Sequence, residues 1–147
     1  IDRDCIFILQ YAHARCCSLL LLGEQIDLIE LKDKQFKQAV WQLSTPVSWL
    51  DKSGKLRSTY PAETYLIERL LAVMDNLCDG ESKNIFNPIV LLSEALVAFR
   101  DNCRIYGDTS KRMPQLAKAR LGLVAATQLL LKISLEELIG ISALVEF

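Results

Sequence analysis

Three side chains with polar tips lie close together near the start of the sequence, at Tyr11, His13 and Arg15. Apolar residues recur around them at helical spacing, which predicts one helix on which Tyr11 and Arg15, four positions apart, share a face. An aromatic ring beside a guanidinium group can stack on a nucleic acid base and neutralise a phosphate. The alternative is an ordinary helix surface, from which Arg15 extends while Tyr11 packs against the protein.

The only histidine points to a second chemistry, because His13 is followed by Cys16 and Cys17 on the same predicted helix. Side chains three or four positions apart can meet, so a general base and a nucleophile are within reach of each other. A cysteine enzyme also needs an orienting group and an oxyanion site, and the sequence shows neither. We therefore expect a buried, hydrogen-bonded histidine and no catalytic residue.

Basic residues gather in the segment 100–120, where six of them stand against two acidic residues. They are Arg100, Arg104, Lys111, Arg112, Lys118 and Arg120. This local excess predicts a patch that contacts phosphates. The alternative is a set of exposed charges that keep the protein in solution. A smaller basic bias at residues 52–57 is typical of a solvated loop.

The sequence lacks metal-ligand spacing, a C-x-x-C pair and the glycine-rich loops that bind nucleotides, so we expect no metal and no cofactor. The five cysteines are odd in number and lie within apolar helical patterns. They predict free thiols in a reducing cytoplasm. Glu136 and Glu137 are neighbours in sequence only, because adjacent helical residues point apart.

Helical periodicity, without an alternating strand pattern, predicts an all-α fold. We expect one domain, residues 1–147, built as a bundle of five to six helices. The expected helices cover residues 4–22 and 27–43, then begin near residues 61, 88 and 114, and close with a short helix at 135–139. Ser44, Thr45 and Pro46 break the pattern, and a loop with an exposed tip at 51–55 follows, for which Trp49 is the candidate anchor.

The composition fits a globular protein with a real core, since the 147 residues are 51% hydrophobic and 24% charged. A net charge of −1 provides no global field for nucleic acid, so any such binding needs a local patch. The apolar run at 19–22 is far shorter than the ~20 residues of a membrane span, so we expect no membrane. The first residue is Ile1 rather than Met, as in a processed product or a piece of a longer protein.

Four motifs follow one another in a specific order. They read QYAHAR at 10–15, AFRDNCRI at 98–105, ARLGLVAAT at 119–127 and LIGI at 138–141. This order resembles the C-terminal anticodon-binding domain of arginyl-tRNA synthetases, the all-helical DALR type found in class Ia synthetases. The resemblance covers the first predicted helix and everything from about residue 61 to the end.

The resemblance implies a helical bundle that packs on the anticodon stem-loop of tRNA and supports arginyl-tRNA aminoacylation within a full synthetase. Tyr11 and Arg15 match the tRNA-facing positions of the first motif, and Phe147 falls at the position of a terminal methionine. Together with three arginines of the basic run they form the candidate tRNA-binding set: Tyr11, Arg15, Arg100, Arg104, Arg120 and Phe147. The motifs of the catalytic domain are absent from this sequence, so we expect no amino-acid activation by this chain alone.

The sequence also departs from the family pattern. Phe99 and Arg100 stand where the family usually has Phe-Tyr, and the last residues, Val145 to Phe147, replace a Glu-Arg-Met type of ending. The stretch 24–60 is longer than the usual connection and predicts an insertion. These differences leave an alternative: a free-standing helical domain that kept the fold but binds protein, either a synthetase catalytic domain or another partner. That alternative predicts an exposed apolar patch around Trp41, Trp49 and Leu50.

Overall fold

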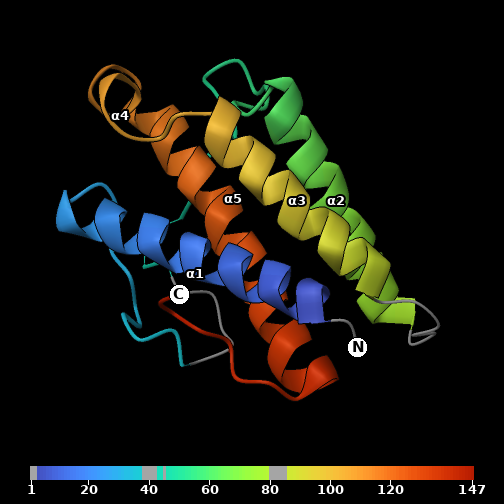
Figure 1. Cartoon of the computed structure of the whole chain (residues 1–147). Coiled ribbons are helices and arrows are strands. Elements are labelled where there is room, and N and C mark those ends of the chain that lie inside the picture. The colour runs from blue at the N-terminus through green and yellow to red at the C-terminus, as the bar shows by residue number, and fades with distance from the viewer. Residues whose placement is uncertain (1–2, 38–42, 45, 80–85) are drawn as a thin grey trace.

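Four long helices pack against one another, and the first of them, α1, crosses α5 and α3 (Figure 1). Their bounds are α1 Arg3–Gln25, α2 Pro61–Asp79, α3 Phe86–Asn102 and α5 Pro114–Ile133. α2 lies beside α3 and also contacts α5. The all-α prediction is confirmed, since the part of the chain that the structure describes holds no β-strand, only two isolated bridges.

The structure is a computed structural model that describes residues 3–37, 43–44, 46–79 and 86–147. Two short helical elements complete the described part, α4 (Asp108–Arg112) and a π-helical turn, η1 (Ser134–Ile139), which continues α5 without a break. The predicted short helix at 135–139 is therefore the end of a longer helical unit. Gly140 ends it with a left-handed backbone, at φ 80°, which turns the chain back toward α1.

α5 is the central helix, as its nearly continuous apolar sequence predicts. Buried residues occur on all its sides, and they include polar ones such as Thr127 and Gln128. Contacts with α1, α2, α3 and η1 cover it. A helix surrounded in this way needs no polar face, which explains its low amphipathicity.

α1 is long and apolar enough to cross a membrane by length and composition. A buried core helix has the same properties, and that is the place of α1 in this structure. Its side chains Leu9, Cys16 and Leu20 are fully buried in the core. Contacts with α3 and α5 cover this face, so packing inside the bundle accounts for its hydropathy.

The helix expected over residues 27–43 is wrong for its described part. Asp27 and Phe36 have positive φ values of 62° and 53°, which a right-handed helix cannot accommodate. The carboxylate of Asp33 accepts hydrogen bonds from the backbone N–H groups of Gln35 and Lys37, at 3.0 and 2.8 Å. A side chain that binds nearby backbone donors stabilises a turn in place of a helix. Residues 38–42 of the expected helix, Trp41 among them, lie outside the described residues.

The apolar residues of this insertion still reach the core. Leu31, Phe36 and Leu43 are buried, although five and seven positions separate them in place of the three or four of a helix. An antiparallel bridge joins Leu31 to Leu43 and closes the segment. The described part of the insertion is therefore an irregular segment held on the core by single apolar side chains.

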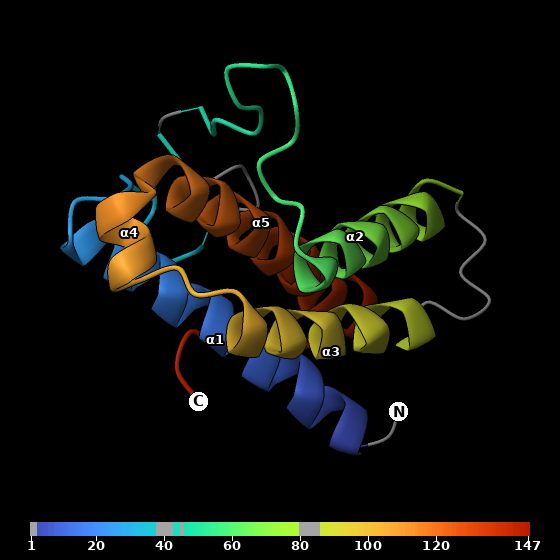
Figure 2. The same cartoon turned by 90° about the horizontal axis from the view of Figure 1, so that it is seen from above.

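Trp49 anchors the second half of the insertion, as predicted. Figure 2 shows this loop over the side of α5 that is turned away from α1. A side chain at Gly122 of α5 would lie 2.7 Å from the Trp49 ring and 2.9 Å from Val47, so only glycine lets the loop approach this closely. Of the predicted apolar patch, Trp49 is thus packed on the core, and Leu50 alone of its described members is exposed.

We predict that Gly122→Ala destabilises the protein, because its methyl group overlaps the Trp49 ring. Overpacking of this kind lowers the free energy of unfolding by about 1–3 kcal/mol. Urea denaturation followed by circular dichroism measures the change. The Trp49→Leu, Val47→Ala background provides the control, because both side chains that the methyl group overlaps are smaller there and Gly122→Ala should cost less. Equal stability of Gly122→Ala and the original chain would contradict the packing of the loop on α5.

Candidate nucleic-acid interface

Three aromatic rings meet on the outer face of α1. Phe7 and Tyr11, one helical turn apart, are nearly parallel, with an interplanar angle of 6° and centroids 6.4 Å apart. Phe147, from the end of the chain, stands edge-on to both, at 4.8 Å from Phe7 and 6.2 Å from Tyr11. Phe7 and Phe147 are 55% and 52% exposed, so this aromatic surface is open to a ligand.

Two arginines border these rings. The guanidinium carbon of Arg15 lies 5.4 Å from the centroid of the Tyr11 ring, within the range of a cation–π contact. From α3, Arg100 donates a long hydrogen bond of 3.5 Å to the Tyr11 hydroxyl. Arg100 also lies 3.6 Å from the exposed carboxylate of Asp101, which satisfies only part of its donor set. Both arginines are partly exposed, although the Nε atom of Arg15 is buried and has no hydrogen-bond partner among the described residues.

We call Phe7, Tyr11, Phe147, Arg15 and Arg100 the aromatic–arginine cluster. The structure thus brings together four residues of the predicted set, from α1, α3 and the end of the chain. Phe7 is the member that the sequence analysis missed. Its signal was the spacing of four between residues 7, 11 and 15, which lines up three side chains on one face of a helix.

The basic run at 100–120 does not form one patch. Arg104 is exposed in the connection after α3, and none of the contacts among the described residues joins it to the aromatic rings. Lys111 and Arg112 are exposed on α4. Lys118 instead lines a hollow that also contains the acidic side chains of Glu24 and Glu30. Only Arg100 of this run reaches the cluster.

Arg120 lies in the interior, against the expectation of a phosphate contact. Its side chain is 3% exposed and forms an ion pair of 3.3 Å with Glu63 of α2, which is fully buried. It also donates a 2.5 Å hydrogen bond to the backbone carbonyl of Arg104 and lies over the ring of Tyr60. A guanidinium group enclosed in this way ties α5 to α2 and is not available to a ligand.

His13 is buried and hydrogen-bonded, as predicted. Its Nδ1 atom lies 2.7 Å from the backbone carbonyl of Leu144, which can only accept, so Nδ1 carries the proton. Nε2 then accepts from the side-chain amide of Gln128 at 3.1 Å. Burial lowers the pKa of His13 below its ordinary value, the Leu144 carbonyl raises it less, and Lys132 lowers it further.

The cysteines beside His13 are not activated. The Cys17 sulfur lies 3.8 and 3.9 Å from the two ring nitrogens, both of which already have closer partners. Burial raises the pKa of the Cys17 thiol to about 12, and burial also raises the pKa of Cys16. Because the thiolate is the nucleophile, burial keeps these thiols in the unreactive, protonated form at neutral pH. All five cysteines are free, and the described residues contain no group of three side chains that could hold a metal ion.

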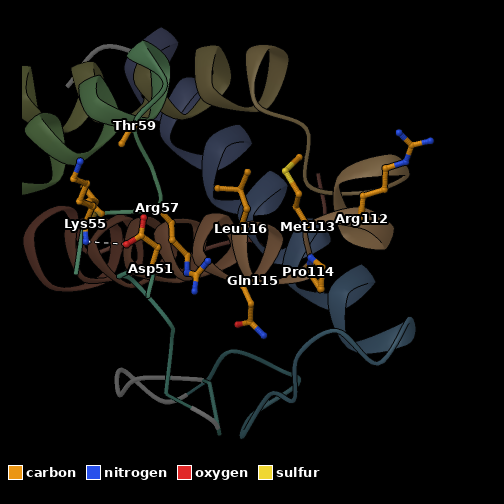
Figure 3. Close-up of a pocket in the computed structure, with 10 residues that line it drawn as sticks. Asp51, Lys55, Arg57, Thr59, Arg112, Met113, Pro114, Gln115 and Leu116 are labelled. Atoms are coloured by element: carbon orange, nitrogen blue, oxygen red, sulfur yellow. Dashed lines mark hydrogen bonds between the residues drawn. The ribbon is translucent and has the colours of Figure 1, made fainter. Parts of the chain in front are cut away.

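A hollow of about 550 Å³ lies where the insertion meets the start of α5, and basic side chains line part of it. Figure 3 shows that Arg112 points away from this hollow, while Arg57 extends toward Gln115. The Asp51 carboxylate accepts from the backbone of Ser53 and Lys55, which keeps a negative charge at its edge. The hollow therefore lacks the converging cations of an anion site.

An apolar groove of about 300 Å³ runs between α2 and α5. Its lining is purely hydrophobic: Ile67, Leu70, Leu71, Met74, Leu123, Ala126, Leu129 and Leu130. Leu71 and Met74 are about half exposed. This surface is a different face from the aromatic–arginine cluster, since α2 contributes nothing to the cluster.

The helical bundle agrees with what the chain is similar to. Residues 9–146 match the family model described as the DALR anticodon binding domain. The chain belongs to this family. The match begins within α1, after Phe7, and ends at the residue before Phe147, so it covers Tyr11, Arg15 and Arg100 of the cluster. The resemblance drawn from the four sequence motifs is thereby confirmed.

Curated relatives point the same way. The chain is 34% identical to an arginine–tRNA ligase of Synechococcus sp. (strain JA-3-3Ab) and 31% identical to one of Salinibacter ruber, each over 97% of this chain. A third arginine–tRNA ligase, from Gloeobacter violaceus, is 30% identical over 92% of it. The chain spans only about a fifth of the length of these relatives, 22%, 22% and 21%. No solved structure matches the chain.

We predict that Arg120→Ala lowers the stability of the protein strongly, because it leaves the Glu63 carboxylate buried without its partner. Breaking a buried pair in this way costs about 3–5 kcal/mol. Thermal or urea unfolding measures the loss. The control is Arg112→Ala on the exposed surface of α4, which changes stability by no more than about 0.5 kcal/mol. Similar stability of the two variants would contradict the interior role of Arg120.

We predict that the single imidazole of this chain titrates below the ordinary value of 6.5. The unfolded chain then takes up the proton first, so the free energy of unfolding decreases as the pH falls through about 6.5. NMR follows His13 without assignment, since no other histidine is present. His13→Asn removes this part of the pH dependence. A pKa at or above 6.5 would contradict the neutral, buried ring.

Proposed function

We propose that this chain is a tRNA-binding module that contacts the anticodon stem-loop through the aromatic–arginine cluster. The observation that carries the proposal is the meeting of open aromatic rings and partly exposed arginines on one face of α1. Proteins recognise single-stranded loops by stacking unpaired bases on aromatic side chains while basic groups contact the phosphates. Membership of the anticodon-binding family supports the same partner.

The residues have distinct roles in this proposal. Phe7 and Phe147 offer the exposed rings, and Tyr11 supports them from the helix surface. Arg15 and Arg100 provide positive charge at the edge of the rings, where the backbone of a stacked loop would pass. Arg104 remains a peripheral candidate, because it is exposed in the connection after α3. Arg120 is left out because it is buried.

The tRNA class follows from the relatives. Those described above are named arginine–tRNA ligases, so we propose a tRNA for arginine and a role in arginyl-tRNA aminoacylation as part of a full synthetase. The reaction itself is assigned to parts of such a synthetase outside this chain, and this chain contributes RNA binding alone. The five free cysteines support a reducing compartment, the cytoplasm.

A protein-docking role is the second candidate, and the apolar groove between α2 and α5 favours it. The catalytic part of a synthetase is the partner that the relatives suggest, because their chains extend far beyond the matched region. The two roles are compatible, since they use different faces. If the chain kept only the protein-docking role, it would not bind tRNA even at low salt.

We predict that Tyr11→Ala and Arg15→Ala each weaken binding of an anticodon stem-loop RNA by about tenfold or more. Tyr11→Ala removes the ring that supports the stacking surface, where base–aromatic stacking contributes about 1–3 kcal/mol per base, and Arg15→Ala removes a phosphate contact. Fluorescence anisotropy with a labelled RNA hairpin measures the affinity. α2 offers a matched control, because Arg69 lies over the Tyr65 ring at 5.5 Å with the same spacing of four. Tyr65→Ala and Arg69→Ala keep full affinity. Equal losses at the two pairs would contradict the assignment of the α1 face.

We also predict that binding weakens steeply with salt, since each neutralised phosphate of a single strand contributes about −0.7 to the slope of log K against log salt. Arg15→Ala and Arg100→Ala should each reduce that slope by about 0.7. The same anisotropy titration, repeated at several salt concentrations, provides the measurement. A slope that neither substitution changes would place the phosphate contacts elsewhere.

A further inference from the structure

The last seven residues run alongside α1 and form no helix or strand of their own. Side chains of α1 hydrogen-bond to their backbone. The Gln10 amide donates to the Ser142 carbonyl at 2.8 Å and accepts from the Leu144 N–H at 2.8 Å. His13 donates from Nδ1 to the Leu144 carbonyl at 2.7 Å. The Gln10 side chain thus both donates to and accepts from the backbone of the segment, as the backbone of a neighbouring β-strand would do.

These two side chains are themselves fixed. Gln10 and His13 are 4% and 1% exposed, and Gln128 of α5 donates to the other ring nitrogen of His13. Glu136 of η1 also binds the segment, since it accepts from the Ala143 N–H at 3.1 Å, and it pairs with Lys132 at 2.8 Å. Three side chains from α1 and η1 therefore bind the backbone of residues 142–144, and α5 supports two of them through Gln128 and Lys132.

Phe147 follows this clamped backbone by three residues. Its ring reaches Phe7 and Tyr11 only because the segment returns along α1 after Gly140. Phe147 itself is about half exposed, so its two ring contacts leave about half of it open to a ligand. The hydrogen bonds at Ser142 and Leu144 hold the backbone three to five residues before Phe147 and so restrict where its ring can lie.

We propose that Gln10 and His13 are positioning residues, which hold residues 142–144 against α1 so that Phe147 completes the stacking surface for RNA. They touch no RNA themselves and act through Phe147. This inference rests on the proposed function, because the value of a placed Phe147 is the affinity that it adds. It assigns a role in RNA binding to two side chains that lie beneath the surface.

Gln10→Met tests the clamp, since it removes both amide contacts and keeps the length of the side chain. Hydrogen exchange of the Leu144 amide reports the clamp directly, and anisotropy with the anticodon stem-loop reports binding. We expect exchange at Leu144 to become at least about tenfold faster while α1 and α5 stay protected. Affinity should fall to the level of Phe147→Ala, and the double variant should lose no more. Gln25→Met, at the exposed end of α1, is the matched control and changes neither reading.

His13 provides an independent pair of variants in case Gln10→Met does not fold. His13→Leu removes the donor to Leu144, whereas His13→Asn places an amide N–H near the position of Nδ1. Asn should restore a slow Leu144 exchange and most of the affinity that Leu removes. A purely structural need for ring volume would instead favour Leu over Asn.

Each result decides one question. Unchanged Leu144 exchange in Gln10→Met overturns the clamp. A released segment with full RNA affinity, alongside weak binding by Tyr11→Ala, overturns the positioning role and leaves the proposed function standing. Absence of RNA binding by the unaltered chain overturns both the proposed function and the role in RNA binding. The exchange rates then still decide whether the clamp holds the segment.

Discussion

The contact between α1 and α5 buries polar side chains, and their need for hydrogen bonds determines the path of the end of the chain. Gln10, His13 and Gln128 are all nearly inaccessible, and a buried donor or acceptor without a partner costs about 1–3 kcal/mol. The acceptors and donors that satisfy Gln10 belong to residues 142–144. An apolar contact between the two helices would pack as well, but it would remove the hydrogen bonds at Ser142 and Leu144 and leave the segment to the Glu136 contact at Ala143 and to the packing of Ala143 and Val145.

Helical periodicity was sufficient to predict the bundle, because α1, α2, α3 and α5 each bury a face or more in one core. It failed over residues 27–43, where the apolar residues are truly buried but reach the core from an irregular backbone. The decisive features there are local, the turn around Asp33 and the positive φ at Phe36, and a pattern of apolar positions cannot reveal them. Periodicity reports which residues are buried more reliably than how the chain brings them there.

The residues of the candidate site also differ in how far the sequence could predict them. Tyr11 and Arg15 were predictable because four residues on one helix fix their distance, and the resemblance to a known family added Phe147. Arg120 was misplaced because its partner, Glu63, is 57 positions away, and residue type alone does not distinguish a buried guanidinium from an exposed one. Phe7 was visible in the sequence, one turn before Tyr11, but only its contact with Phe147 makes it part of the cluster.

The hydrogen bonds from Gln10 and His13 are made to main-chain atoms of Ser142 and Leu144, and they do not depend on which side chains those residues carry. The segment can therefore change in sequence while its backbone stays in the same place. Phe147, three positions after Leu144, can then be replaced while the backbone that positions it stays in place. A domain built in this way can alter the chemistry of one contact by a single substitution, without refolding or repacking the helices beneath it.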